Sequence, residues 1–278
     1  MNWKGMEYAP YLPFSLILYL ISFRVCYHVV KALWPYFAAH QNPPEHLLLD
    51  ISNKIISGIN AFYASVICAP IVLWSTRHDV MKARHFYADY LPWWGAGYGL
   101  YDVWSMFTVH RSKMIDLAQK ADKDPPRPRQ LLTSFAKTHA LILFHHLFLM
   151  IVCFPASVVL AYGKGNFFFG CFASLEMSTP FVSFRFVLSK AGLKPTLLYK
   201  VNGALMIVTF FICRILIFPF MFYTYAQYTN LSILEVILIL PRKCLFCSTC
   251  VLIPQLYWFT LMMLGAREVY REVFKKKT

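Results

Sequence analysis

Seven apolar runs, each about 20 residues or longer, are the feature of this chain that most constrains its fold. A helix of that length is needed to cross a hydrocarbon core roughly 30 Å thick. We therefore predict an all-α, polytopic membrane helical bundle of about seven transmembrane helices. The predicted spans are Tyr11–Trp34, Ile55–Trp74, Tyr87–Val109, Ala140–Tyr162, Asn166–Leu188, Val201–Tyr225 and Leu245–Gly265.

Composition agrees with a membrane protein, because 58% of the residues are hydrophobic and only 14% are charged. The net charge of +14 does not indicate nucleic-acid binding, since the basic residues lie between the apolar runs rather than on one soluble face. The first run resembles a secretory signal, but no small-residue cleavage site follows it and the run continues past Arg24. We interpret it as a retained span.

Lysine and arginine are distributed unevenly between the two sides of the predicted bundle. With seven spans and a cytosolic C-terminus, the cytosolic ends and loops hold 18 of the 27 basic residues, and the opposite side holds 7. Arg24 and Arg214 are the other two and lie inside spans. Because cytosolic loops carry the excess of basic residues, the N-terminus is predicted to be lumenal.

Two short motifs agree with this orientation. Lys275 and Lys276 stand fourth and third from the end, as in dilysine signals that return proteins to the endoplasmic reticulum through coat-protein contact. We therefore expect an endoplasmic reticulum membrane protein that cycles through the Golgi, although a plain basic anchor for anionic lipids is the alternative. On the lumenal side, Asn230 begins a glycosylation sequon whose modification the sequence leaves open.

The segments between the spans give weaker predictions. Leu231–Leu240 is too short to span and is expected to lie along the interface or to re-enter. The prolines and charges of Arg111–Lys137 indicate an exposed loop. Pro155, Pro180 and Pro219 lie inside spans and predict kinks that open space between helices.

Five ionisable residues inside the spans fall at two depths. Counting about 1.5 Å per residue puts His145, His146 and Asp102 roughly 12 Å from the cytosolic face. The same count puts Glu176 and Arg214 roughly 21 Å from that face, and we predict an ion pair there because either charge alone is costly in a bilayer.

The paired histidines suggest chemistry. Adjacent helical residues point about 100° apart, so one ring can face a cavity while the other bonds to a neighbouring helix. Burial favours the neutral imidazole, which serves as a nucleophile or a general base, and a carboxylate such as Asp102 can hold its tautomer. This arrangement suits acyl transfer, although buried histidines that are only satisfied polar residues of the core are the alternative. The histidine pair lacks the i, i+4 spacing that places two metal ligands on one helix face. Cys244, Cys247 and Cys250 resemble part of an iron–sulfur site but lack a fourth ligand. We therefore expect no metal and no bound cofactor.

The stretches "FHHLFLMIVCFP", "GKGNFFFGC", "LEMSTPFVSF", "LLYKVNGALMIVTFFICRILIFPFMF" and "PQLYWF" together resemble the TLC-domain family, most of all its ceramide-synthase-like members. The resemblance covers roughly 51–265 and implies a TLC domain of six transmembrane helices, after an N-terminal segment at 1–50 with the first span and before a basic cytosolic tail at 266–278. Ceramide synthases carry a double histidine followed by aspartates on the next span. His145 and His146 match the histidines, Glu176 stands near the first aspartate position, and the second falls near Thr179, which is no carboxylate.

The resemblance implies an N-acyltransferase that moves a fatty acyl group from acyl-CoA to a sphingoid base. In that reading His145, His146 and Asp102 are catalytic, and Glu176, Arg214 and Thr179 support the site. The phosphates of acyl-CoA lie near the basic residues of the Arg111–Lys137 segment, which are Lys120, Lys123, Arg127 and Arg129. The alternative is a non-enzymatic lipid-binding regulator or a cargo receptor between endoplasmic reticulum and Golgi. The expected partners are membrane lipids and not nucleic acid, and the sequence leaves open a homodimer or a heterodimer.

Overall fold

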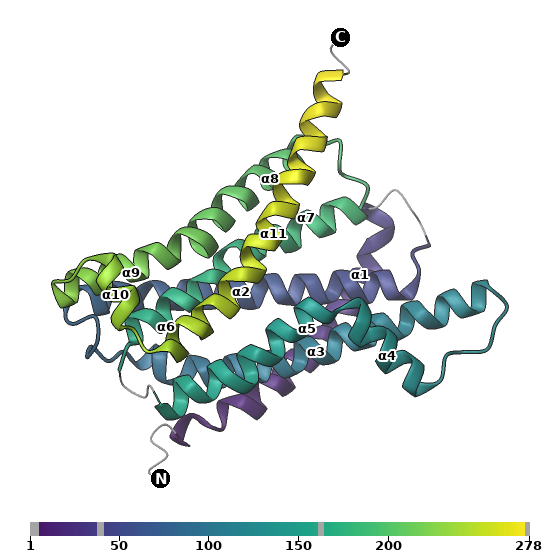
Figure 1. The fold of residues 1–278 in the computed structure, drawn as a ribbon. Coiled ribbons are helices and arrows are strands. Elements are labelled where there is room, and N and C mark those ends of the chain that lie inside the picture. Colours follow the sequence, from purple (N-terminus) through teal and green to yellow (C-terminus); the bar gives the residue numbers. More distant parts are fainter. Residues whose placement is uncertain (1–5, 38–41, 161–163, 276–278) are drawn as a thin grey trace.

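The computed structural model describes residues 6–37, 42–160 and 164–275, and within those ranges the regular structure is helical (Figure 1). Six helical stretches are long and apolar enough to cross a membrane. They are Met6–Phe37, Glu45–Arg77, Ala140–Val158, Asn166–Lys190, Leu197–Thr229 and Arg242–Arg267. The chain is therefore a multi-pass helical membrane protein.

The elements follow one another as a set of long helices, several of them interrupted. The α-helices are α1 (Tyr11–Phe37), α2 (Glu45–Arg77), α3 (Phe86–Lys120), α4 (Pro128–Thr138), α5 (Ala140–Phe148), α6 (Asn166–Ala173), α7 (Thr179–Lys190), α8 (Leu197–Phe210), α9 (Ile217–Thr229), α10 (Ile233–Ile239) and α11 (Arg242–Lys275). The remaining segments are the 3-10 helices η1 (Met6–Tyr8) and η4 (Ser174–Ser178), and the π-helical η2 (Leu149–Cys153), η3 (Ala156–Leu160) and η5 (Phe211–Leu216).

The remaining predicted span, Tyr87–Val109, lies in α3, which is 35 residues long but falls short of the apolar composition of the other six. Its polar residues are the reason: Asp89, Asp102 and His110 lie along it, and tyrosine and tryptophan replace aliphatic side chains. The helix nevertheless packs closely against both α1 and α2. It therefore belongs to the bundle, with its polar side chains turned inward.

The predicted loop at Arg111–Lys137 is wrong for most of its length. Helix α3 continues to Lys120, with an ion pair of 2.8 Å between Lys120 and Asp116 one turn apart, and α4 begins at Pro128. Proline is favoured at the first position of a helix, and the side chain of Gln130 accepts a hydrogen bond from the Arg127 amide at the helix N-terminus. Pro128 thus begins a helix, and only 121–127 is loop.

The expected kinks occur where the spans leave α-helical geometry. Pro155 lies between the π-helical segments η2 and η3, Pro180 stands just after the 3-10 segment η4, and Pro219 follows η5. Proline cannot donate to the carbonyl four residues earlier, so it favours such local changes of helical pitch. Glu176 and Arg214 lie within η4 and η5, so both predicted charges of the deeper level sit on irregular turns.

Ring contacts fix the direction of the first helices. Tyr8 meets Phe86, Phe14 meets Trp94 and Phe23 meets Trp104, so α1 and α3 run parallel with an offset of about 80 residues. The two helices come unusually close where Ser15 of α1 meets Gly97 of α3. Ser15 is buried and donates a hydrogen bond to the carbonyl oxygen of Trp94. A Cβ atom on residue 97 would overlap the Ser15 side chain. The chain passes back and forth along the bundle, and its two termini lie at opposite ends (Figure 1).

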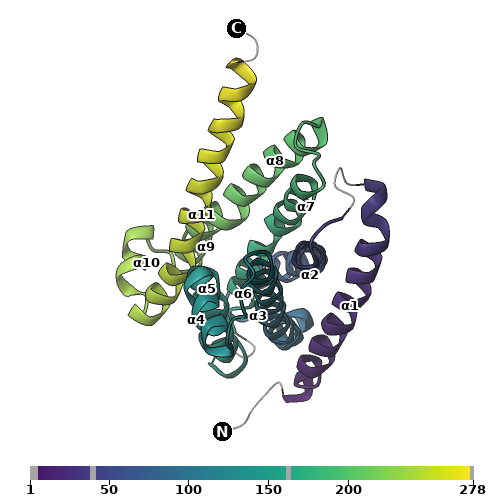
Figure 2. The ribbon, with the colours of Figure 1, turned by 90° about the vertical axis from the view of Figure 1, so that its right-hand side faces the viewer.

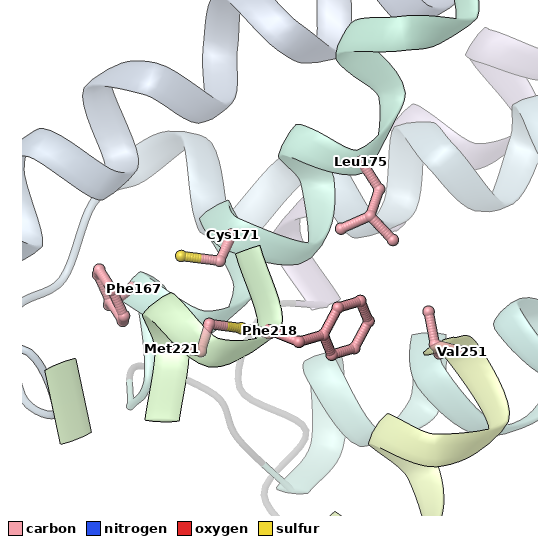
Figure 3. Close-up of a cluster of buried hydrophobic side chains, with 6 residues drawn as sticks. All are labelled: Phe167, Cys171, Leu175, Phe218, Met221 and Val251. Atoms are coloured by element: carbon pink, nitrogen blue, oxygen red, sulfur yellow. The ribbon is translucent and has the colours of Figure 1, made fainter. Parts of the chain in front are cut away.

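One apolar cluster joins the later helices at the end of the bundle that holds α10. Figure 3 shows Phe167, Cys171 and Leu175 from α6 and η4 beside Phe218, Met221 and Val251 from α9 and α11. In the view of Figure 2, α1 lies at one edge of the bundle and α10 at the other, with α2, α3 and α6 between them. Most of the buried positions are supplied by α2 and α3.

The segment predicted to lie at the interface, Leu231–Leu240, forms the short helix α10 packed on α9. Ser232 and Glu235 form its capping box. Leu234 and Leu238 are among the most exposed large apolar side chains of the described residues.

Candidate functional site

His146 and Asp102 lie together in the interior, as their matched depths predicted. His146 Nδ1 is 3.1 Å from Asp102 Oδ2, and both side chains are shielded, with 18% and 9% of their surface exposed. Helices α3 and α5 run antiparallel here, since Trp93 also meets Phe154 on the same interface. Asp102 therefore faces one ring nitrogen of His146 and leaves the opposite nitrogen, Nε2, for other contacts.

A row of polar residues on α2 holds this part of α3. Asn53 Oδ1 accepts hydrogen bonds from Tyr101 and Ser105 at 3.1 and 2.8 Å, and the Asn53 side chain also lies within hydrogen-bonding range of Asp102. One turn further along, Ser57 accepts a hydrogen bond of 3.0 Å from Tyr98. These bonds fix the rotation of α3 about its axis and with it the direction of the Asp102 carboxylate.

His145 points to a different neighbour, as the angle between adjacent helical residues requires. Its ring meets Trp258 of α11 edge to face, with centroids 5.5 Å apart. Within the described residues its ring nitrogens have no hydrogen-bond partner, and Arg214 lies within electrostatic range. The two imidazoles therefore divide their contacts between α3 and α11, and their centroids are 5.8 Å apart.

Arg214 does not form the predicted direct ion pair with Glu176; among the described residues no nitrogen of Arg214 lies within 4.0 Å of that carboxylate. Thr179 stands between them instead. Its hydroxyl accepts from Arg214 Nη2 at 2.7 Å and donates to Glu176 Oε2 at 3.0 Å. The reason is local: η4 places Glu176 one tight turn before Thr179, so the shorter side chain reaches the guanidinium first.

The other nitrogens of Arg214 are also satisfied. Nε donates to Ser178 at 2.8 Å, and Nη1 donates to Gln255 of α11 at 2.9 Å. Gln255 is fully buried. Each of the three nitrogens thus donates one hydrogen bond, which offsets the cost of placing a charge in a membrane interior.

We call these residues the polar belt, since they cross the interior from α3 to η4: Asp102, His146, His145, Gln255, Arg214, Thr179 and Glu176. Tyr98 lies between the two ends of the belt, within electrostatic range of both Asp102 and Glu176. The belt offers a carboxylate-supported imidazole, a second imidazole without a hydrogen bond and a fixed cation. Such a set can accept a proton and stabilise developing negative charge.

The predicted phosphate-binding residues lie elsewhere. Lys120, Lys123, Arg127 and Arg129 are exposed at the end of α3, in the following loop and at the start of α4. Lys120 is paired with Asp116, which also faces His46 at 3.5 Å. Eighteen residues of α3 separate Asp102 from Lys120, a distance of about 27 Å along the helix.

Two other predicted features lie outside the belt. Asn230 is exposed and ends α9 in a left-handed conformation, with φ of 55°. Lys276 lies outside the described residues, and Lys275 is the last residue of α11, so the dilysine-like motif has no described side-chain geometry.

Sequence reasoning missed Gln255, Asn53 and Ser178. All three are uncharged, and amides and hydroxyls within apolar runs did not stand out as ionisable residues did. A signal for Gln255 was present, since it belongs to the "PQLYWF" stretch and is a costly side chain to bury without a partner.

A comparison with protein families agrees with this architecture. The family model described as the TLC domain matches residues 50–264, which is most of the chain. No solved structure matches the chain.

Proposed function

The chain belongs to the TLC-domain family, and we propose that it is a ceramide-synthase-like N-acyltransferase that moves a fatty acyl group from acyl-CoA to a sphingoid base. The family includes ceramide synthases and other lipid-related membrane proteins. The acyltransferase activity is the finer proposal, and it depends on the chemistry of the polar belt.

The contact between Asp102 and His146 is the observation that carries the proposal. A carboxylate facing Nδ1 favours the tautomer with its proton on that nitrogen, which leaves a lone pair on Nε2. A base held in this way by a third group is the usual arrangement for activating a nucleophile. A histidine that only satisfied buried polarity would not need to keep Nε2 free.

In the proposed step the amine nitrogen of the sphingoid base attacks the thioester carbonyl carbon. His146 Nε2 takes the amine proton, the carbon–nitrogen bond forms, and the carbon–sulfur bond breaks. The coenzyme A thiolate leaves and receives the proton from His146, so the histidine ends neutral. The nearby Arg214 supplies positive potential for the carbonyl oxygen while it carries negative charge, and the neutral ring of His145 can donate an N–H hydrogen bond to the same oxygen.

Four residues position the guanidinium of Arg214 and do not react themselves: Thr179, Glu176, Ser178 and Gln255. Together they hold the guanidinium of Arg214 from three elements, so its charge stays at one place in the interior. The sequence departs from the ceramide-synthase pattern at Thr179, and the hydroxyl offsets this departure because it joins Arg214 to the remaining carboxylate, Glu176.

The phosphates of acyl-CoA are proposed to bind at Lys123, Arg127 and Arg129, with Lys120 beside them. These cations are exposed at one end of the bundle, so the carrier arm has to extend along α3 to bring the thioester to His146. The acceptor amine enters from the membrane. No metal or bound cofactor is needed for this chemistry.

Location in the endoplasmic reticulum, with cycling through the Golgi, is supported by the basic tail that contains Lys275 and Lys276. That tail has to face the cytosol to contact a coat protein, and the excess of basic residues on the same side agrees with this orientation. A homodimer and a heterodimer both remain compatible with the fold.

Purified full-length protein in lipid nanodiscs, supplied with acyl-CoA and sphinganine, tests the activity. We expect N-acylated product from the wild type and a loss of about a hundredfold or more in rate for His146→Ala, because general-base catalysis contributes that much. Lys82→Gln, an exposed residue at the far end of the bundle, is the matched control. Equal product from wild type, His145→Ala and His146→Ala would exclude the enzyme and favour the lipid-binding or cargo-receptor function.

A further inference from the structure

Arg24 has an unusual position for a charged residue in a membrane protein. It lies near the middle of α1, counts about 10 Å inward from Lys31, and its side chain is exposed on the outer surface of the bundle. Charged residues within spans normally face the interior or pair with one another. Within the described part of the chain, Arg24 makes no hydrogen bond and no ion pair.

A groove surrounds this arginine. Its walls are Leu20, Ile21, Val25 and Trp104, with Arg24 among them, and its volume is about 360 Å³. Phe23 holds the two helices together behind it through an edge-to-face contact with Trp104. The groove is therefore a shallow, open apolar surface beside Trp104 of α3, with the cation of Arg24 in it.

More basic residues continue from the groove toward the end of the bundle. His28 and Lys31 follow Arg24 at i+4 and i+7, so they lie on the same face of α1, and both are exposed. The offset of about 80 residues between the parallel helices brings Arg111 of α3 to the level of Lys31. Arg111 is exposed and lies two turns beyond Trp104, again on the same face.

Among the residues that the structure describes, this face carries no opposing charge. Helix α1 contains no acidic residue from Tyr11 to Phe37, Asp102 of α3 is turned inward to His146, and Asp116 is paired with Lys120. A second copy of the chain packed face to face through α1 would set arginine against arginine. The charge pattern instead requires an anion with an apolar tail.

We propose that the groove between α1 and α3 is a binding site for an anionic phospholipid. Its headgroup lies among Arg24, His28, Lys31 and Arg111, and one acyl chain follows the groove past Val25, Ile21 and Leu20. The long side chain of Arg24 reaches toward the phosphate from below, as arginines near membrane interfaces do. Basic pockets between spans are known to recognise anionic lipid headgroups in this way.

Fluorescent phosphatidylserine, titrated into the detergent-solubilised full chain, measures the site. Each basic residue near a membrane surface contributes about 1 kcal/mol to binding anionic lipid, which corresponds to about a fivefold change in affinity. We expect Arg24→Gln and Arg111→Gln each to weaken binding about fivefold. Phosphatidylcholine with the same chains is expected to bind more weakly to the wild type and to respond little to either change.

Lys137→Gln is the matched control, because it removes the same charge from an exposed residue on α4, away from the groove. Ile21→Trp is the shape control: it keeps every charge, fills the groove and is expected to weaken binding. If Lys137→Gln weakened binding as much as Arg24→Gln, the acidic lipid would be attracted only by the general positive charge of the protein. That result would overturn the site. Unchanged affinity in Arg24→Gln, or a dimer that forms through α1 in cross-linking and excludes the lipid, would overturn it as well.

Discussion

Thr179 bridges two half-buried charged side chains, Arg214 and Glu176. Its hydroxyl is at once an acceptor for Arg214 and a donor to Glu176. Thr179→Val keeps the shape but leaves both partners short of a hydrogen bond, which we expect to lower the free energy of unfolding by about 1–3 kcal/mol. Thr179→Ser keeps the hydroxyl and is expected to stay close to wild type.

Thermal unfolding of both variants in the same detergent checks this. Equal melting temperatures for Thr179→Val and Thr179→Ser would mean that the bridge contributes nothing. Recovery of stability in the double variant Thr179→Val with Glu176→Gln would support the bridge, because the carboxylate that lost its donor is then neutral.

At the scale of residues, the sequence located the ionisable side chains and one of their pairings, Asp102 with the histidines, but not the other contacts. Counting residues along predicted spans placed Asp102 and His146 at one depth, and the structure brings them to 3.1 Å. The same counting suggested contact between Glu176 and Arg214, which Thr179 prevents. Depth is one coordinate only; the rotation of each helix about its axis depends on packing, as with Asn53 and Tyr101.

At the scale of elements, the crossing of α1 and α3 depends on Gly97. A Cβ atom there would overlap Ser15 Oγ and the carbonyl oxygen of Leu12, which is backbone and cannot turn aside. We expect Gly97→Ala to separate the helices and to destabilise the protein by about 1–3 kcal/mol, as overpacking does. Gly95→Ala, where a Cβ atom meets nothing within 4 Å, is the matched control.

Chemical unfolding monitored by near-ultraviolet circular dichroism suits this comparison, because tyrosines and tryptophans fill the α1–α3 interface. Gly95→Ala is expected to be neutral or slightly stabilising, since alanine favours helix more than glycine does. Destabilisation of both variants to the same extent would argue against the close crossing.

The sequence predicted the elements well where hydropathy determines the helix. It predicted them poorly where helix capping and proline determine where a helix begins or changes pitch. Six of the seven spans appear as long apolar helices. The interval 111–137 was misjudged because its prolines were interpreted as loop signals, whereas Pro128 begins α4. The π-helical turns of η2, η3 and η5 were expected only as kinks, because proline indicates that a helix changes there but not how.

For the whole molecule, the number of crossings decides which side each terminus faces. If α3 crosses the membrane, the chain crosses seven times and its termini lie on opposite sides; without α3 they lie on the same side. Termini at opposite ends of the bundle favour seven (Figure 1). In intact microsomes we expect a C-terminal epitope tag to be digested by added protease and an N-terminal tag to be protected.

Digestion of both tags without detergent would place α3 at the membrane surface and reverse this conclusion. The sequence suggested the same orientation from its basic residues, but the arrangement of the helices around the polar belt was not predictable from it. Contacts such as His145 with Trp258, or Arg214 with Gln255, join segments that are far apart in the chain, and no periodicity specifies them.

The central claim is that Asp102 and His146 act as one unit in acyl transfer. A double-mutant cycle measures this directly: kcat/KM for acyl-CoA and sphinganine with wild type, Asp102→Asn, His146→Gln and the double variant, each compared at equal folded concentration. Residues that act as a unit are strongly non-additive. We predict that each single change lowers kcat/KM by about a hundredfold or more and that the double variant is no worse than His146→Gln. Independent, multiplying losses, or full activity in Asp102→Asn, would contradict the account.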